Sequence, residues 1–355
     1  MKIIRLSTFL DFGGVETRLA NISHVQDKNE WVFVTINREG KAAKIIRENQ
    51  KRIINLQTKP SIYSLKTFFK VYQSLKKEKP DVIHTSGAEA NFHGILAAKL
   101  AKVPVIIGEE IGTPNHSKKA QLIFSKVYAF ADFVVGNSKA VLDVVHQLDK
   151  VPQKKLIKID NPILFKPLQE KTENHNDLFR ILMISRLEPV KNIEGVLNVL
   201  AQLVKENKNI RLTIAGTGTS EISLKEKVKS LHLDDYVDFV GFINDPYPYL
   251  ANADLYILNS FSEGFSNSLV EAMYSKTPSL STNVGAAPEI IQDGINGFIT
   301  LSDNETALCK KIKTIMSLSH EERKKIGEEG QQTVVNNFSL DKHIEELMKI
   351  YKNNS

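Results

Sequence analysis

The chain has 355 residues, of which 42% are hydrophobic and 25% charged, as in ordinary soluble globular proteins. Its single cysteine, Cys309, excludes an intrachain disulfide and a zinc site built from several cysteines, which fits a reducing compartment. No run of about 18 uncharged apolar residues occurs, and the start, MKIIRLSTFL, lacks the long apolar core of a secretory signal. The length suggests two domains, and a cytoplasmic protein is expected.

Charge is distributed unevenly along the chain. Residues 1–166 hold 27 Lys and Arg against 15 Asp and Glu, a net charge of +12, whereas the remainder holds 20 against 26, a net charge of −6. A basic half favours nucleic acid or anionic lipid, or it simply carries scattered solubilising lysines. Helix-turn-helix, zinc-finger and RNA-stacking patterns are missing from the sequence, so we expect no nucleic-acid partner.

Short apolar runs alternate with longer amphipathic stretches along the whole chain. The pattern predicts strands at 2–7, 31–36, 81–84, 103–107, 132–136 and 156–159, and after a break at 179–185, 210–216, 236–241, 254–258, 277–281 and 297–300. Strand–helix alternation is typical of parallel sheets covered by helices. We therefore predict an α/β protein with two doubly wound domains.

Residues 161–179 interrupt the alternation and form the predicted linker. They contain two prolines and a polar run over 169–177, a composition typical of domain boundaries. We predict an N-terminal domain at 1–165, a C-terminal domain at 166–338 and a last helix within 339–355. Ligands of doubly wound domains bind at the carboxyl ends of the strands, so the site is predicted in a cleft between the domains.

Two loops after predicted strands could bind an anion. Gly13 and Gly14 precede a helix predicted to begin near residue 15, and glycines there let backbone amides approach an anion; an ordinary turn has the same pattern. In ISRLEPVKN, Arg186 and Lys191 supply a fork-shaped and a point-like cation, which together suit a diphosphate; two solvated loop cations are the alternative.

A third loop, IAGTGTSE, places Gly216 after the next predicted strand. Gly216-x-Gly218 has the spacing that begins a dinucleotide fingerprint, but Glu221 stands where the third glycine belongs. Nicotinamide binding is therefore not expected, and a loop facing the cleft is.

Two glutamates lie on either side of a predicted helix start in NSFSEGFSNSLVEAM. Ser268 and Glu271 have the spacing of a capping box, which leaves Glu263 on the turn without a structural explanation. Ionised carboxylates accept hydrogen bonds from sugar and ribose hydroxyls. Two carboxylates beside an anion site therefore fit a nucleotide sugar, in which phosphates join two hydroxyl-bearing rings.

The second half closely resembles glycosyltransferase family 4, whose members are retaining enzymes with the GT-B fold. The resemblance is carried by RLEPVKN, IAGTG, VDFVGFIND, ADLYILNSFSEGFSNSLVEAMYSKTPSLSTNVGAAPEII and DGINGFI. FGGVETRLANI and PDVIHTSGAEANFHGILAAKLAKVPVII look like the family's N-domain, so the resemblance covers nearly the whole chain. It implies two Rossmann-like domains facing a central cleft, with the acceptor on the N-domain, the donor on the C-domain and the last helix crossing back.

The resemblance also implies a role for each matching residue. Arg186 and Lys191 would bind the donor diphosphate and Glu263 the hydroxyls of the donor sugar, and these three are the expected catalytic residues. Glu271 would hold the ribose. The full implied donor-binding set is Gly13, Gly14, Arg186, Lys191, Gly216, Phe242, Glu263, Gly264, Phe265, Ser266 and Glu271.

The chain departs from the family in the loop after the fifth strand. Many relatives carry a histidine there, near the outer hydroxyl of the donor sugar, where this chain has Ile111 after Glu110. A second familiar histidine is replaced by Glu89. These changes suggest a donor without the usual C6 hydroxyl, or one bound differently. His84, Glu110 and Ile111 are the candidate residues beside the acceptor or donor sugar, although a histidine on a strand is more often structural.

The expected function is transfer of a sugar from a nucleotide sugar, with a UDP-sugar favoured, to a lipid-linked saccharide in surface-glycan assembly. No cofactor or metal is expected, because no Asp-x-Asp motif occurs at the expected place. The basic half suggests peripheral association with the inner face of an anionic membrane. Alternatives are a transferase for a protein or soluble acceptor, an epimerase or phosphorylase of similar architecture, and a non-catalytic nucleotide-sugar binder.

Overall fold

The computed structural model describes residues 1–11, 13–112, 117–168 and 178–352, and it divides into two compact units. The N-terminal unit comprises Met1–Leu164 with Phe338–Ser355, and the C-terminal unit comprises Phe165–Asn337. The predicted boundaries, after 165 and 338, differ from these by a single residue. The polar run of the predicted linker, 169–177, lies outside the described residues.

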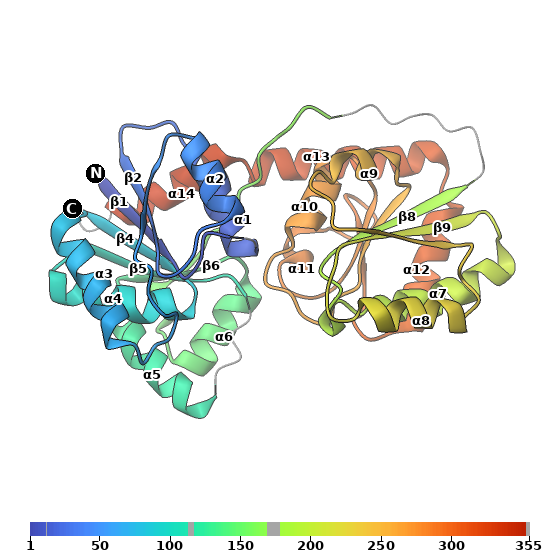
Figure 1. Ribbon diagram of the computed structural model, residues 1–355. Coiled ribbons are helices and arrows are strands. Elements are labelled where there is room, and N and C mark those ends of the chain that lie inside the picture. Colours follow the sequence, from blue (N-terminus) through green and yellow to red (C-terminus); the bar gives the residue numbers. More distant parts are fainter. Residues whose placement is uncertain (12, 113–116, 169–177, 353–355) are drawn as a thin grey trace. The chain divides into compact units, whose positions relative to one another are not determined.

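The N-terminal unit contains a seven-stranded parallel sheet in the order β3-β2-β1-β4-β5-β6-β7 (Figure 1). The order reverses direction between β1 and β4, as in a Rossmann fold. The strands are β1 (Lys2–Ser7), β2 (Glu30–Thr35), β3 (Arg52–Asn55), β4 (Val82–Ser86), β5 (Val105–Glu110), β6 (Phe133–Gly136) and β7 (Leu156–Lys158).

Helices cover both faces of this sheet, because apolar side chains alternate along its buried strands. Ile3 and Phe33 point to a core shared with α1, α2 and α14, whereas Ile4 and Val32 point to a core shared with α3, α4, α5 and α6. The helices are α1 (Gly14–Ile22), α2 (Lys41–Glu48), α3 (Leu65–Glu78), α4 (Ala88–Ala101), α5 (Lys118–Ala129), α6 (Lys139–Asp149), the short η1 (Gln153–Lys155) and α14 (Leu340–Lys352).

The C-terminal unit repeats this design with a six-stranded parallel sheet in the order β10-β9-β8-β11-β12-β13. Here the order reverses between β8 and β11, the position where open α/β sheets bind ligands. The strands are β8 (Phe179–Ile184), β9 (Ile210–Ala215), β10 (Val237–Gly241), β11 (Leu255–Leu258), β12 (Ser279–Thr282) and β13 (Phe298–Thr300).

One large core lies on the face of this sheet that α7, α8 and α12 cover, where Ile181, Leu212 and Ile257 pack against them. On the opposite face α9 contacts β8, and α10 contacts β11 and β12. The helices are η2 (Pro189–Lys191), α7 (Ile193–Glu206), α8 (Glu221–Ser230), α9 (Tyr247–Asn252), α10 (Asn267–Tyr274), α11 (Ala287–Ile290), α12 (Glu305–Ser317) and α13 (His320–Asn337).

The α/β prediction is therefore confirmed, with two differences in detail. The edge strand β3 was not predicted, since it holds only two strongly apolar residues and is partly exposed. Glu109 and Glu110, expected in a loop, are the last residues of β5. Among the helices that the structure describes, none combines the length and hydropathy needed to span a bilayer.

Candidate functional site

The loops after β8 and β11 meet at the reversal point of the C-terminal sheet. The loop after β8 ends in η2, which carries Lys191, and the loop after β11 carries Glu263. Backbone contacts join them: the Phe261 N–H donates to the Val190 carbonyl at 2.8 Å, and the Asn259 side chain donates to the Asn192 carbonyl at 3.0 Å. The strand order and these bonds bring two residues that are far apart in sequence to one place.

Lys191 and Glu263 form an ion pair at this place. The Lys191 ammonium donates to Oε1 of Glu263, and Ser260 Oγ donates to the same oxygen at 2.6 Å. Both charged side chains are mostly buried, with 14% and 12% of their surface exposed. The pair therefore presents a cation and a carboxylate, held in fixed positions, at the carboxyl end of the sheet.

Arg186 lies on the same β8 loop, and its side chain is exposed. A neighbouring loop holds this segment in place: the Leu187 N–H donates to the Thr217 carbonyl at 2.9 Å, and Glu188 accepts from the Thr219 hydroxyl at 2.7 Å. Gly216 permits the close approach, because a Cβ there would lie 1.8 Å from the Ser185 carbonyl oxygen. The Gly216 motif thus has a structural cause, and its contact with a donor stays a prediction.

Helix α10 begins two residues earlier than the capping-box interpretation requires. Ser266 is its N-cap, and its hydroxyl accepts from the Leu269 N–H at 3.2 Å. Ser268 lies inside the helix, where the Tyr256 hydroxyl donates to it at 2.8 Å. The capping box of Ser268 and Glu271 is therefore wrong, and Glu271 has no capping role that would explain it.

Glu271 lies on α10 in a region with two other charged groups. Burial raises the pKa of its carboxyl to about 7; the positive charge of Lys166 opposes this shift, and the negative charge of Asp245 adds to it. Lys166 itself lies 3.7 Å from Asp245. Phe242, which follows β10, exposes 47% of its surface. Glu271 and Phe242, both in the predicted donor-binding set, are thus on the same C-terminal unit as the Lys191–Glu263 pair.

The segment from Glu263 to Phe265 rests on the loop after β12. The Ala286 N–H donates to the Gly264 carbonyl at 2.9 Å. Gly285 has a φ of +57°, and a Cβ on it would lie 2.6 Å from the Glu263 carbonyl oxygen. Phe265 is 9% exposed and anchors the segment in the core. Gly285 therefore packs against the backbone that carries Glu263, the predicted catalytic carboxylate.

If the predicted donor is a UDP-sugar, we expect Gly285→Ala to weaken both UDP binding and turnover by about tenfold or more, because the new Cβ pushes the Glu263–Gly264 backbone away. The matched control is Gly294→Ala, in the same unit, where φ is +77° but nothing lies within 4 Å of the added Cβ. Both variants strain a left-handed residue, so both lose stability. Calorimetric UDP titration separates them, and equal UDP affinities would contradict a supporting role for Gly285.

In the N-terminal unit, the predicted glycine loop precedes helix α1. Gly13 is the N-cap and Gly14 the first helical residue, and no described side chain caps this end. At the start of α4, Glu89 accepts a hydrogen bond from Thr8 at 3.2 Å. The structure thus places the Gly13–Gly14 turn and Glu89 at the carboxyl edge of one sheet, and the glycines' contact with a diphosphate stays a prediction.

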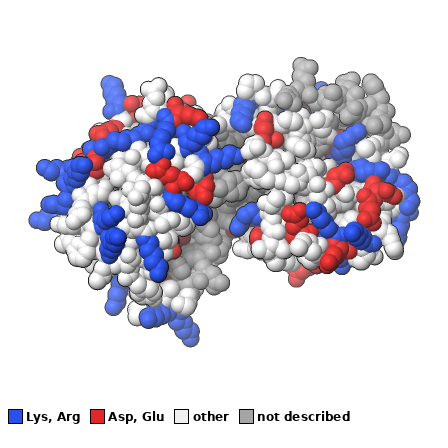
Figure 2. Space-filling model, viewed as in Figure 1, with Lys and Arg blue, Asp and Glu red and all other residues white. Residues whose placement is uncertain are grey.

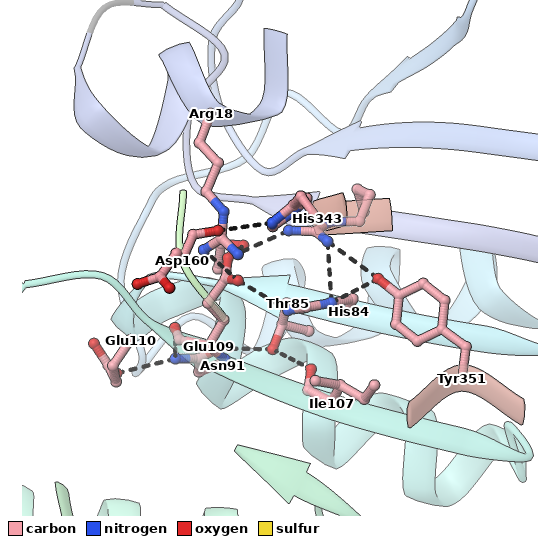
Figure 3. A network of polar contacts seen from close by, with 12 residues as sticks. Arg18, His84, Thr85, Asn91, Ile107, Glu109, Glu110, Asp160, His343 and Tyr351 are labelled. Atoms are coloured by element: carbon pink, nitrogen blue, oxygen red, sulfur yellow. Dashed lines mark hydrogen bonds and ion pairs between the residues drawn. The ribbon is translucent and has the colours of Figure 1, made fainter. Parts of the chain in front are cut away.

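His84 does not line a site, contrary to one prediction. Its side chain is fully buried, with Nδ1 3.0 Å from Arg5 and 2.7 Å from the Tyr351 hydroxyl (Figure 3). Nε2 lies 3.2 Å from Glu109. Burial, with a further contribution from the charge of Arg5, lowers the pKa of His84 to about 4. His84 is therefore a neutral structural residue at pH 7.

Glu109 is the centre of this polar network. It pairs with Arg18 at 2.5 Å and with Arg5 at 3.3 Å, and Ser86 donates to it at 2.5 Å. Figure 3 shows Arg18 reaching the network from α1 and Tyr351 from α14. The network thus connects the helix after the glycine loop, the sheet and the last helix of the chain.

Glu110 and Ile111, the other two candidates beside the sugar, differ in accessibility. Glu110 is buried and accepts hydrogen bonds from the Tyr128 hydroxyl at 2.5 Å and from Asn91 at 3.0 Å, so it is held as a structural group. Ile111 is half-buried, and its carbonyl accepts from Asn137 at 2.7 Å. Its side chain is the more accessible of the two, and its place beside a sugar stays a prediction.

The sequence analysis missed three supporting groups. Ser260 lies three residues before Glu263 in the stretch that was already singled out, and the spacing gave a usable signal. Gly285 and Lys166 belong to other segments, and only the fold brings them near. Within the described part of the chain, no group of three or more His, Cys, Asp or Glu side chains is placed to hold a metal ion.

Comparisons with known proteins agree with this architecture. The model for glycosyltransferase family 4 matches residues 12–163, and the model for glycosyl transferases group 1 matches residues 165–333. A crystal structure of Anabaena HepE in complex with UDP superimposes with a TM-score of 0.85 at 20% identity, covering 98% of this chain and 99% of that one. The two family models together span nearly the whole chain.

Two curated relatives have names that state a reaction. A Campylobacter jejuni GalNAc-α-(1→4)-GalNAc-α-(1→3)-diNAcBac-PP-undecaprenol α-1,4-N-acetyl-D-galactosaminyltransferase is 28% identical over 330 residues, 89% of each chain. An Escherichia coli UDP-Gal:α-D-GlcNAc-diphosphoundecaprenol α-1,3-galactosyltransferase is 24% identical, covering 82% of this chain and 80% of the relative. The chain therefore belongs to glycosyltransferase family 4 and is a glycosyltransferase with the GT-B fold.

Proposed function

We propose that this glycosyltransferase moves a sugar from a UDP-sugar to a lipid-linked saccharide, with retention of configuration, in the assembly of a surface polysaccharide. The observation that carries the proposal is the Lys191–Glu263 pair, held by Ser260 at the point where the strand order of the C-terminal sheet reverses. The sequence resemblance contributes the retaining stereochemistry. The relatives' names contribute the acceptor class.

The donor is a UDP-sugar in this proposal. Lys191 and the exposed Arg186 bind the diphosphate, and Glu263 accepts hydrogen bonds from the hydroxyls of the sugar. Glu271 accepts from the ribose hydroxyls, while the amides of Gly264 and Phe265 lie near the phosphates. Support comes from UDP-galactose in the name of the Escherichia coli relative and from UDP in the HepE complex.

In the proposed reaction, the bond between the anomeric carbon and the diphosphate oxygen breaks first. Negative charge grows on the leaving phosphate, where Lys191 and Arg186 stabilise it. Positive charge grows on the sugar ring beside the Glu263 carboxylate. The acceptor hydroxyl then attacks from the face that the diphosphate leaves, and the phosphate takes its proton. No metal takes part in this proposal, since two cations already face the leaving group.

The acceptor is a saccharide linked to a lipid diphosphate. Both curated relatives carry undecaprenol in their names. The N-terminal half of this chain has a net charge of +12, which suits an anionic lipid headgroup or diphosphate. We assign acceptor binding to the N-terminal unit, which also associates peripherally with the membrane.

A donor panel tests the proposal directly. Purified protein is incubated with UDP-, GDP- and dTDP-sugars and a polyprenyl-diphosphate saccharide, and both the released nucleotide and the glycolipid product are measured. We expect UDP release and a product with an α-linkage when the donor is α-linked, unchanged by EDTA. An inverted product would contradict the retaining mechanism. Loss of turnover in EDTA that magnesium restores would contradict the metal-free mechanism, and transfer only to a soluble acceptor would contradict the lipid-linked acceptor.

The same panel tests the role of Ile111. Its apolar side chain replaces a histidine that many relatives carry, and it would pack well on the methyl group of a 6-deoxy sugar. We therefore propose a donor without the C6 hydroxyl. Much faster turnover of the 6-hydroxyl donor than of its 6-deoxy counterpart would show this to be wrong.

We expect UDP affinity to rise between about pH 6 and pH 8, because only the ionised Glu271 is a full acceptor for both ribose hydroxyls and its pKa lies at about 7. Below that value the carboxyl is protonated in the free protein and binding must first release the proton. Glu271→Gln should remove this part of the pH dependence, measured by calorimetry with UDP. The phosphate of UDP titrates equally with both proteins, so identical pH profiles would contradict the ribose assignment.

A further inference from the structure

Helix α3 presents apolar side chains to solvent. Leu65 exposes 74% of its surface and Phe69 exposes 55%, and they lie one turn apart on the side opposite the buried Val71 and Leu75. Tyr63, just before the helix, exposes 73%. The outer face of a surface helix is normally polar, so this one requires an explanation.

Helix α5, on the same side of the sheet, continues the feature. On α5, Leu122 exposes 62% of its surface and lies opposite the buried Phe124. Helix α4 packs between α3 and α5, and its Phe92 and Leu96 are partly buried against the core of the unit. The exposed apolar side chains of α3 and α5 therefore form a band on one side of the N-terminal unit, with α4 between the two helices.

Lysines flank this band, and the acidic side chains of these helices are already engaged. Lys66 and Lys76 are exposed on α3, and Lys119 is exposed on α5. Helix α5 contains no Asp or Glu. Glu78 of α3 is buried in ion pairs with Lys2 and Arg52 on the far side of the helix, and Glu89 of α4 accepts from Thr8. In Figure 2, lysines stand among uncharged side chains over this part of the unit, with very little red.

We propose that the α3–α5 surface, defined by Leu65, Lys66, Phe69, Lys76, Lys119 and Leu122, docks on an anionic lipid bilayer. Apolar side chains enter the interface while lysines contact the headgroups, which is how peripheral proteins bind such membranes. Nucleic acid would use the lysines but leave Leu65, Phe69 and Leu122 exposed. A single bilayer satisfies both features along the whole band.

The position of the band suits the proposed acceptor. The N-terminal ends of α3 and α5 follow the carboxyl ends of β3 and β5, so Leu65 and Lys119 lie towards the edge of the sheet that also carries the Gly13–Gly14 turn and Ile111. A bilayer on the α3–α5 surface would present a lipid-linked saccharide near that edge. The link between this surface and the acceptor rests on the proposed function. Binding of the protein to a membrane does not depend on turnover and is measured separately.

Vesicle co-sedimentation tests the docking surface. The full chain is mixed with vesicles of phosphatidylcholine and phosphatidylglycerol, or of phosphatidylcholine alone. We expect binding to the anionic vesicles only, weakened by salt and reduced at least about tenfold in Leu65→Glu/Phe69→Glu and in Lys66→Ala/Lys76→Ala. Binding of the unchanged protein to neither vesicle, as expected for a surface that binds an acidic protein, would overturn the inference.

Matched variants exclude a general effect of charge or apolarity. Ile222→Glu replaces a side chain that is 75% exposed on the C-terminal unit, and Lys324→Ala/Lys325→Ala removes an adjacent pair of exposed lysines there. Both should bind vesicles like the unchanged protein; equal losses in these controls would also overturn the inference. All variants should retain Trp31 fluorescence and release of UDP from the donor, so loss of the proposed activity would be seen separately.

Discussion

Lys191→Ala is expected to lower kcat/KM by about a hundred- to a thousandfold, the usual effect of removing one charge-stabilising group from a transition state. The ammonium has a fixed place, because it donates to Glu263 and is 14% exposed. In the proposed mechanism, its removal takes away one of the two cations that stabilise the leaving diphosphate. It also removes the ammonium that balances the mostly buried charge of Glu263, so the same variant loses stability.

Glu263→Gln tests the role of the carboxylate separately from that of the Lys191 ammonium. The amide still accepts and donates hydrogen bonds, but it no longer carries the charge that faces the sugar ring in the proposed mechanism. Turnover should therefore fall by a similar factor, whereas UDP, which lacks the sugar, should bind about as well as before. Lys191→Ala, in contrast, should weaken UDP binding as well as turnover.

Calorimetry with UDP and initial rates with the donor measure both effects. The matched control is Lys311→Ala, which breaks another ion pair of the same unit, at 2.8 Å from Asp293, away from the reversal point of the sheet. It should change neither quantity. Unchanged UDP affinity in Lys191→Ala, or unchanged turnover in Glu263→Gln, would contradict the roles assigned to them.

Most of the fold was predictable because buried parallel strands have a simple sequence pattern. Largely apolar runs such as FRILMIS and IRLTIAG identify central strands regardless of what surrounds them. The edge strand β3, with the sequence RIIN, is short and partly exposed, so it lacks that pattern. The other edge strands, β7, β10 and β13, hold enough apolar residues to be predicted, so β3 is the exception.

The candidate site was predictable only where its residues lie on single loops. Lys191 and Glu263 each follow a predicted strand, and the usual order of strands in such sheets brings their loops together. The start of α10 was not predictable, since Ser266 and Ser268 are both suitable caps. The Tyr256 hydroxyl, which binds Ser268, decides between them, and this contact depends on tertiary structure.

The buried network around Glu109 shows the same limit in the N-terminal unit. Arg5, Arg18, His84 and Tyr351 meet Glu109 only because β1 lies between β2 and β4 and α14 packs on that face. Nothing in the sequence near His84 indicates these partners. A histidine on a strand near the carboxyl edge looks the same whether it lines a pocket or fills a core.

We expect Glu109→Gln to destabilise the N-terminal unit by about 3–5 kcal/mol, because it leaves two buried guanidinium groups, of Arg5 and Arg18, without their carboxylate. Glu110→Gln is the matched control, since this neighbouring buried carboxylate is bound by the neutral Tyr128 and Asn91. It should cost only about 1 kcal/mol. Adding Arg18→Met to Glu109→Gln should recover part of the loss, because one of the uncompensated charges is removed.

Urea unfolding followed by fluorescence measures this loss in the right unit. The chain has a single tryptophan, Trp31, which is buried in β2 with its ring 6.3 Å from Tyr351 of α14. Its emission therefore reports unfolding of the N-terminal unit alone. Equal midpoints for Glu109→Gln and Glu110→Gln would contradict the special role of the Glu109 network.

The pH dependence of the same transition provides an independent measurement. Burial alone would raise the pKa of Glu109, but the charges of Arg18 and Arg5, together with the hydrogen bond from His84, hold it well below 4.5. Its stabilising contribution is therefore complete above pH 4.5 and is lost as the pH falls towards the lowered value. His84 remains neutral in the folded state but takes up a proton below pH 6.5 when unfolded. Stability should thus begin to fall below pH 6.5, and in Glu109→Gln the further loss below pH 4.5 should be smaller, because the variant has no carboxylate there to protonate.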